Sequence, residues 1–179
     1  NRSENSHKLL IVEGGIVSNY AKNIIEVLLS INSYPVSIYG KIHEILERKL
    51  KINKLSNIKL YSAVERKLMP KIFQDHHIFF CVEHNPTCPN SVLEAVSSGL
   101  PVIGFDNGSL KELVGDAGII IKLDNFFHES NRDMMFQSIK KSISEISENY
   151  NQFSYKARER AKVFDSNIVF NKYFKILTN

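Results

Sequence analysis

The feature of the sequence that most constrains its fold is an alternation of short apolar strands with segments of helical period. Strands are expected at residues 8–13, 35–39, 57–61, 78–82, 101–105 and 117–122. Helical segments separate them, and the sequence from residue 131 onwards is predicted to be helical. Strands that alternate with helices in this way form βαβ units. The sequence therefore predicts an α/β fold, with a Rossmann-like parallel sheet of about six strands and helices on both faces.

Glycines are expected to mark three boundaries. Gly14 and Gly15 are predicted to turn the chain after the first strand, and Gly40 to stop the second. Gly99 is predicted to end a helix at residues 90–98. No repeat, low-complexity segment or linker divides the chain. Residues 1–179 are therefore expected to form a single domain, with residues 164–179 as a closing helix.

Composition excludes several classes of protein. Hydrophobic residues make up 43% of the 179 residues, which is enough apolar surface to offset the entropy of folding. The longest apolar runs, such as residues 78–82, fall far short of the roughly 20 residues that span a bilayer. A net charge of +4 without a dense Lys/Arg block gives no reason to expect a nucleic-acid partner. With no signal peptide and only Cys81 and Cys88, a cytoplasmic protein is expected.

The loop after the strand at residues 78–82 is the most informative stretch, because parallel sheets of this kind bind ligands at the carboxyl ends of their strands. Pro89 is expected at the first position of the following helix. The N–H groups of Asn90 and Ser91, with the positive end of the helix dipole, then form an anion site suited to phosphate. Glu94, about one turn further, is placed to accept hydrogen bonds from two vicinal sugar hydroxyls.

The stretch from Pro89 to Val114, PNSVLEAVSSGLPVIGFDNGSLKELV, resembles retaining glycosyltransferases of the two-lobed GT-B fold, of the glycosyl transferases group 1, family 4 type. Specifically, it is similar to the carboxyl-terminal lobe, which binds the nucleotide-sugar donor. The motif Glu-Ala-x-x-x-Gly-Leu-Pro-Val followed by Gly-Ser-x-x-Glu carries the resemblance, which extends over nearly the whole chain. It implies transfer of a sugar, with retention, from a UDP- or GDP-linked donor to an acceptor hydroxyl. The amino-terminal acceptor lobe is expected to be absent from this chain.

Some of the family's site residues have a match in this sequence and others do not. The family places two Glu residues with seven others between them, and the second, which holds the ribose, matches Glu94. The position of the first is Pro86, which has no side-chain acceptor, while Glu83 stands three residues earlier as a substitute. A second family feature is an Arg followed by a Lys after the first strand, where the two cations neutralise the diphosphate. Lys22 matches the Lys, and no Arg stands upstream of it.

The resemblance thus implies a site in which Lys22 and Glu94 are catalytic, while Gly14 and Gly15 let a phosphate approach the backbone. The expected donor-binding residues are Gly14, Gly15, Asn90, Ser91, Glu94, Gly108 and Ser109. Neither a metal nor a cofactor other than the nucleotide-sugar substrate is implied, because no carboxylate cluster is placed to bridge the phosphates. The expected acceptor is a glycan or a lipid-linked sugar, reached through the absent lobe. Peripheral association with the inner face of a membrane is expected of the full-length protein.

Structural roles stay open for these candidates. Glu94 and Lys22 are also compatible with solvated helix positions, Gly14 and Gly15 with a simple turn, and Ser109 with a helix cap. Two other functions stay open as well. One is a non-catalytic module that binds a nucleotide or a partner, which Pro86 and the missing Arg favour. The other is a sugar-nucleotide epimerase of the same fold, which needs further acid/base residues in the crevice.

Overall fold

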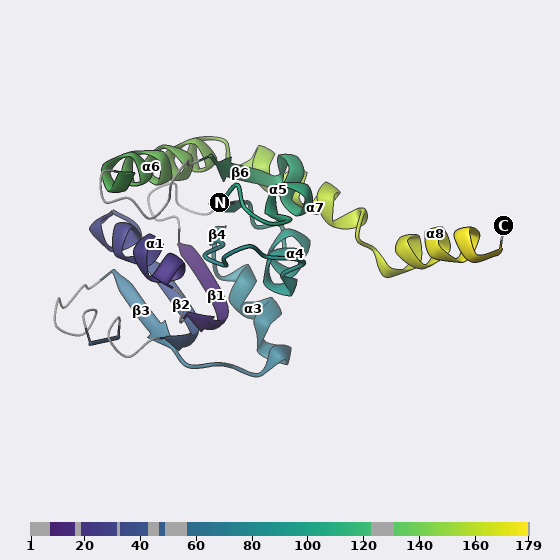
Figure 1. Ribbon diagram of the computed structural model, residues 1–179, viewed down its shortest axis with the longest axis horizontal. Helices are drawn as coiled ribbons and strands as arrows, with labels where there is room; N and C mark the ends of the chain where they lie inside the picture. Colours follow the sequence, from purple (N-terminus) through teal and green to yellow (C-terminus); the bar gives the residue numbers. More distant parts are fainter. Residues whose placement is uncertain are drawn as a thin grey trace.

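The computed structural model describes residues 8–16, 19–31, 33–42, 47–48, 57–122 and 131–178. Within these ranges the chain forms a parallel six-stranded sheet of order β3-β2-β1-β4-β5-β6 (Figure 1). Its strands are β1 (Leu9–Ile16), β2 (Val36–Ile42), β3 (Ile58–Tyr61), β4 (Ile78–Phe80), β5 (Val102–Phe105) and β6 (Gly118–Ile121). The predicted α/β fold with a parallel, Rossmann-like sheet of about six strands is therefore confirmed.

Helices cover both faces of this sheet, as expected. On one face α1 and α6 pack in a single apolar cluster with the strands, and on the other α3, α4, α5 and α7 contribute to a second cluster. The helices are α1 (Asn19–Ser30), α3 (Met69–Gln74), α4 (Asn90–Ser97), α5 (Leu110–Val114), α6 (Arg132–Glu148), α7 (Tyr150–Lys162) and α8 (Ser166–Thr178), with short 3-10 helices η1 (Arg66–Leu68) and η2 (Gly115–Ala117).

Strand β4 shows why its sequence has no polar alternation. Ile78 and Phe80 pack into the cluster with α1 and α6, and Phe79 packs into the opposite cluster with α3 and α4. Successive side chains of a strand point to opposite faces, so a strand covered on both sides needs apolar residues at every position. This agrees with the prediction that helices lie on both faces of the sheet.

The first two strands extend further than predicted. β1 continues through Gly14 and Gly15, with an irregular register between Glu13 and Ile16, and β2 continues through Gly40 to its end at residue 42. The prediction that these glycines end the strands is wrong. Pairing between the two strands resumes beyond the irregular stretch that holds Gly14 and Gly15, at Ile16 and Ile42, so the strands continue past the glycines. Gly40 has a φ of 132°, a conformation that glycine tolerates beside the irregular register.

Other predicted boundaries have mixed outcomes. Gly99 has a φ of 76° directly after α4, which confirms its role as the residue that ends that helix. The helical segment expected between the second and third strands lies largely outside the described residues. Ile42 belongs to β2, and residues 47–48 are helical.

The direction in which the strands follow one another reverses between β1 and β4. From β1 the chain moves outward to β2 and β3, and from β4 it moves outward the other way to β5 and β6. The segments that follow β1 and β4 therefore leave the sheet in opposite directions from neighbouring strands. Open parallel sheets bind ligands at such a reversal, at the carboxyl ends of the strands.

Helix α8 projects away from the rest of the molecule (Figure 1). None of its residues is buried, and Phe170 and Leu177 are 66% and 82% exposed. Among the described helices, this one included, none is both long and apolar enough to cross a bilayer.

Deleting residues 166–178 is expected to leave the melting temperature within about 2 °C of its original value. A helix that buries no residue contributes about as little as an ordinary surface position, within about 0.5 kcal/mol. Thermal unfolding followed by circular dichroism measures the difference. A fall of more than about 5 °C would show that α8 packs on the body in solution.

Candidate functional site

The start of α4 lies at the carboxyl edge of the sheet. Pro89 is its N-cap and not its first helical residue, because its ψ of 117° is extended and the helix begins at Asn90. The carbonyl oxygen of Pro89 accepts a hydrogen bond from the Val92 N–H at 3.1 Å. The N–H groups of Asn90 and Ser91 come before this first intrahelical bond, so they point out of the helix end as the sequence predicts. Such a helix end attracts anions.

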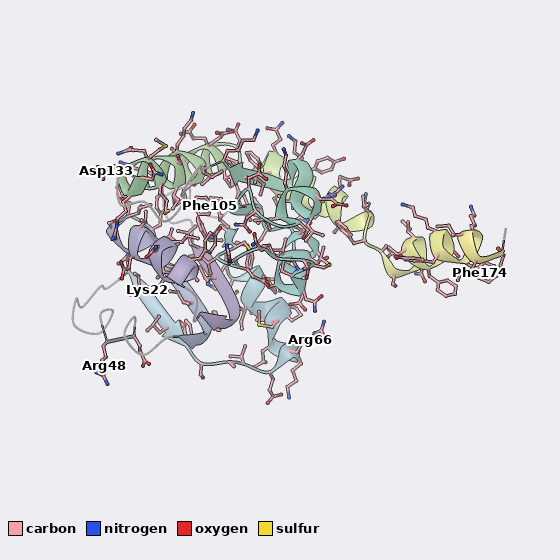
Figure 2. The ribbon with its side chains drawn as sticks, viewed as in Figure 1. Lys22, Arg48, Arg66, Phe105, Asp133 and Phe174 are labelled. Carbon is pink, nitrogen blue, oxygen red and sulfur yellow. The ribbon has the colours of Figure 1, made fainter. Side chains whose placement is uncertain are left out.

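Glu94 lies on the same side of α4 as Asn90, since the two are four residues apart. Its Oε1 accepts a hydrogen bond from Nη2 of Arg66 at 3.2 Å. The Glu94 side chain is 32% exposed and the Arg66 side chain is 83% exposed. The Arg66 side chain therefore extends from η1 to Glu94 of α4 while most of its surface stays exposed to solvent. In Figure 2 the Arg66 side chain lies at the edge of the molecule.

Glu94 and Arg66 both line a cavity of about 360 Å³ between α3 and α4. Its apolar lining comes from both helices, and its polar lining includes Asn90 at the start of α4. The lining residues are Arg66, Met69, Pro70, Phe73, Asn90, Leu93, Glu94, Ser97 and Ser98. The volume and the mixture of apolar and polar groups are typical of a small-molecule site.

The loop after β5 is fastened to the loop after β4 at Pro86. The Pro86 carbonyl oxygen accepts hydrogen bonds from the Ser109 N–H at 2.8 Å and the Ser109 hydroxyl at 3.0 Å. Ser109 precedes α5, but its side chain makes no cap bond to that helix. Ser109 therefore holds the predicted N-cap position of α5, but its hydroxyl donates to the neighbouring loop and not to the helix. Gly108, with a φ of 53°, lies directly against Pro86.

A second set of contacts joins the same two loops to α1. The Asn107 side chain accepts a hydrogen bond from the Asn85 N–H at 3.0 Å and donates one to the Tyr20 hydroxyl. The Tyr20 ring also contacts the His84 ring, with 4.8 Å between their centroids. Burial raises the pKa of the Tyr20 hydroxyl above its usual value, so this group stays neutral. The loops after β4 and β5 are thus held over the first turn of α1.

The structure brings most of the predicted site residues to one edge and separates one from them. Gly14 and Gly15 lie near the end of β1, and the glycine–serine pair 108–109 lies in the loop after β5. Lys22 is half-buried on α1. At 100° per residue, it lies about 200° around the helix from Tyr20. Lys22 therefore points away from the side of α1 that contacts the two loops.

The histidines before β4 have separate structural contacts. Nδ1 of the buried His76 lies 2.6 Å from the Ile72 carbonyl oxygen, and Nδ1 of His77 accepts a hydrogen bond from the Lys8 N–H. Burial lowers the pKa of His76. In the part of the chain that the structure describes, no three His, Cys, Asp or Glu side chains gather as a metal site would require.

The model of one protein family, described as glycosyl transferases group 1, matches residues 10–134. The chain belongs to the glycosyl transferases group 1 family. No match was found among curated protein sequences.

Solved structures of glycosyltransferases share the fold of this family member. The pneumococcal O-GlcNAc transferase GtfA superposes with a TM-score of 0.76 at 18% identity, over 97% of this chain and 36% of GtfA. WaaG, a glycosyltransferase involved in lipopolysaccharide biosynthesis, gives 0.67 at 19%, over 91% of this chain and 44% of WaaG. Sucrose-phosphate synthase from Thermosynechococcus elongatus gives 0.75 at 10%, over 98% and 46%. The chain thus spans less than half the length of these three proteins, and its fold is that of one lobe of a GT-B glycosyltransferase.

Sequence reasoning missed three residues of the site. Arg66, Tyr20 and Asn107 each contact a predicted element from a distant part of the chain. Arg66 stands in the segment after β3, and the rule that ligands bind after strands was available to find it. For Tyr20 and Asn107 the sequence offers no comparable signal, because 87 residues separate them.

Proposed function

We propose that this chain is the donor-binding lobe of a retaining glycosyltransferase that uses a UDP- or GDP-linked sugar. The observation that carries the proposal is the position of Glu94, whose carboxylate faces the cavity of about 360 Å³ beside the start of α4. A carboxylate there accepts hydrogen bonds from the two ribose hydroxyls, while the α4 amides take the diphosphate. Family membership supports the reaction class, and GtfA was solved in complex with UDP and GlcNAc.

The start of α4 supplies the charge stabilisation that such a transfer needs. In the reaction the bond between the anomeric carbon and the diphosphate oxygen breaks, and the electron pair leaves with the nucleoside diphosphate. A new bond forms to the acceptor oxygen on the same face of the sugar, and the acceptor hydroxyl transfers its proton to an oxygen of the departing diphosphate. The Asn90 and Ser91 amides and the helix dipole stabilise the negative charge that grows on the diphosphate.

The structure gives less support to Lys22 than to the start of α4 as a group that stabilises the charge on the diphosphate. Lys22 lies on the side of α1 opposite the Tyr20 contacts, so reaching the diphosphate requires its long side chain to bend around the helix. Gly14 and Gly15, near the end of β1, allow close approach of a phosphate without adding charge. The acceptor we propose is a glycan or a lipid-linked sugar, which the similarity to WaaG, named for lipopolysaccharide biosynthesis, supports.

Replacing Glu94 by Ala is expected to weaken UDP or GDP binding at least tenfold. The substitution removes both ribose hydrogen bonds to a charged acceptor, each worth roughly 1.5–3 kcal/mol. Isothermal titration of the chain with UDP and with GDP measures the loss. Glu145→Ala, at an exposed position on α6, is the matched control and keeps the affinity of the unmodified chain. Equal affinities for the unmodified chain and Glu94→Ala, or no binding at millimolar nucleotide, would overturn the proposal.

One observation favours a second candidate function, a non-catalytic nucleotide-binding lobe. Pro86 occupies the position where the resemblance places a Glu that contacts the donor sugar, and it is buried with its carbonyl bonded to Ser109. This loop offers no carboxylate at that position. Nucleotide binding that depends on Glu94, combined with no sugar transfer or donor hydrolysis by a protein that carries both lobes, would favour this candidate.

A further inference from the structure

Arg66 is placed to read the base of a nucleotide bound at Glu94. We propose that Arg66 selects bases with a carbonyl group, uracil or guanine, over the corresponding amino bases, cytosine or adenine. The inference rests on the proposed function, because it assumes that a nucleotide places its ribose at Glu94.

The geometry puts Arg66 within reach of the base. Its Nη2 lies 3.2 Å from Glu94 Oε1, and both side chains line the same cavity between α3 and α4. A base is attached directly to the ribose, so a ribose held at Glu94 places the base next to the guanidinium. The cavity wall at this point is apolar, formed by Met69, Pro70, Phe73 and Leu93. Such a wall suits the face of a planar ring and leaves the edge of the ring to the guanidinium.

The Arg66 side chain is available for this contact at little cost. It is 83% exposed, and its hydrogen bond to Glu94 is made by one guanidinium nitrogen. An exposed ion pair of this kind contributes little to stability, so rearranging it costs little. A guanidinium has five N–H donors in a planar fork, so it can keep one bond to the carboxylate and present others to the cavity.

The chemistry of the guanidinium fixes the kind of base it favours. It donates hydrogen bonds and accepts none. Uracil presents the O4 carbonyl oxygen, and guanine presents the O6 oxygen beside N7, which together match the guanidinium fork. Cytosine and adenine present an amino group at the same positions, so donor would face donor. The pairs UDP/CDP and GDP/ADP differ most directly in this group.

Lys67 provides a matched control next to Arg66. It carries the same charge and is 74% exposed on the same 3-10 helix, and its Nζ pairs with Glu65 Oε2 at 2.6 Å. It is not among the residues that line the cavity. Replacing Lys67 therefore removes one positive charge from the neighbourhood without changing the cavity.

The test compares the affinities of UDP, CDP, GDP and ADP for the unmodified chain and for Arg66→Ala, Arg66→Lys, Lys67→Ala and Glu94→Ala by isothermal titration. The unmodified chain is expected to prefer the carbonyl base in at least one pair by about tenfold. Arg66→Ala brings that affinity ratio close to one, because it weakens binding of the nucleotide whose base carries the carbonyl group. Arg66→Lys gives an intermediate ratio, because an ammonium lacks the planar fork. Lys67→Ala keeps the ratio.

Any of three results would overturn the inference and leave the proposed function standing. The first is nucleotide binding that depends on Glu94 but shows ratios near one in the unmodified chain. The second is a preference that persists in Arg66→Ala. The third is loss of the preference in Lys67→Ala as well, which would assign it to general charge. Binding that is unaffected by Glu94→Ala would instead count against the proposed function itself. Thermal unfolding confirms that each variant is folded.

Discussion

Replacing Phe80 by Ala is expected to lower the free energy of unfolding by about 3–5 kcal/mol. Phe80 lies in β4, at the centre of the sheet, and its side chain is 0% exposed. Its ring meets Phe105 of β5 edge to face, with 6.2 Å between the centroids. The substitution leaves a cavity between the sheet and the α1–α6 layer, and it removes the aromatic pair.

Chemical denaturation followed by circular dichroism measures this loss. The chain offers a matched control in Phe174, which is 56% exposed on α8 and lies far from Phe105 in Figure 2. Phe174→Ala is expected to change the free energy of unfolding by less than about 0.5 kcal/mol. Similar losses for the two variants would contradict the division between a buried core and an unpacked α8.

Replacing Gly108 by Ala is expected to cost about 3 kcal/mol of stability and to weaken nucleotide binding. Two effects add at this position. The φ of 53° is unfavourable for a residue with a Cβ by about 1–2 kcal/mol. The new Cβ would also meet the Pro86 carbonyl oxygen and lie 2.7 Å from the Asn85 carbonyl carbon, both in backbone that cannot turn aside. The loop after β4, which leads into α4, would have to shift.

Gly115→Ala separates the two effects. Gly115 has a nearly identical φ of 52°, but the atom nearest to its added Cβ is Nε of the flexible Arg160 side chain, at 3.4 Å. Because Gly115 has a ψ of −128°, this variant is expected to lose about 1–3 kcal/mol from backbone conformation alone and to keep its nucleotide affinity. Denaturant unfolding and nucleotide titration of both variants make the comparison. Equal losses of nucleotide affinity at the two positions would show that the contact between the loops does not support binding.

The part of the site that sequence reasoning could predict is the part encoded within one element. The start of α4, the position of Glu94 one turn inside it and the stop at Gly99 follow from the residues between 89 and 99. Helical period, a proline before a helix and a glycine after it all act over a few residues. The strand boundaries at Gly14 and Gly40 were wrong, because pairing between β1 and β2 outweighed the local tendency of glycine to turn the chain.

The sequence alone determined the alternation of strands and helices, and with it the parallel sheet and the edge at which we propose that a nucleotide binds. Only the tertiary structure decided which side chains meet at that edge. Arg66 meets Glu94 across 28 residues, and Asn107 meets Tyr20 across 87. Such pairs depend on how separate elements pack, and no local pattern records that packing. The orientation of Lys22 away from the loops follows equally from the rotation of α1 that buries Tyr20. Local periodicity thus fixes the elements, and burial of their apolar faces against one another fixes the site.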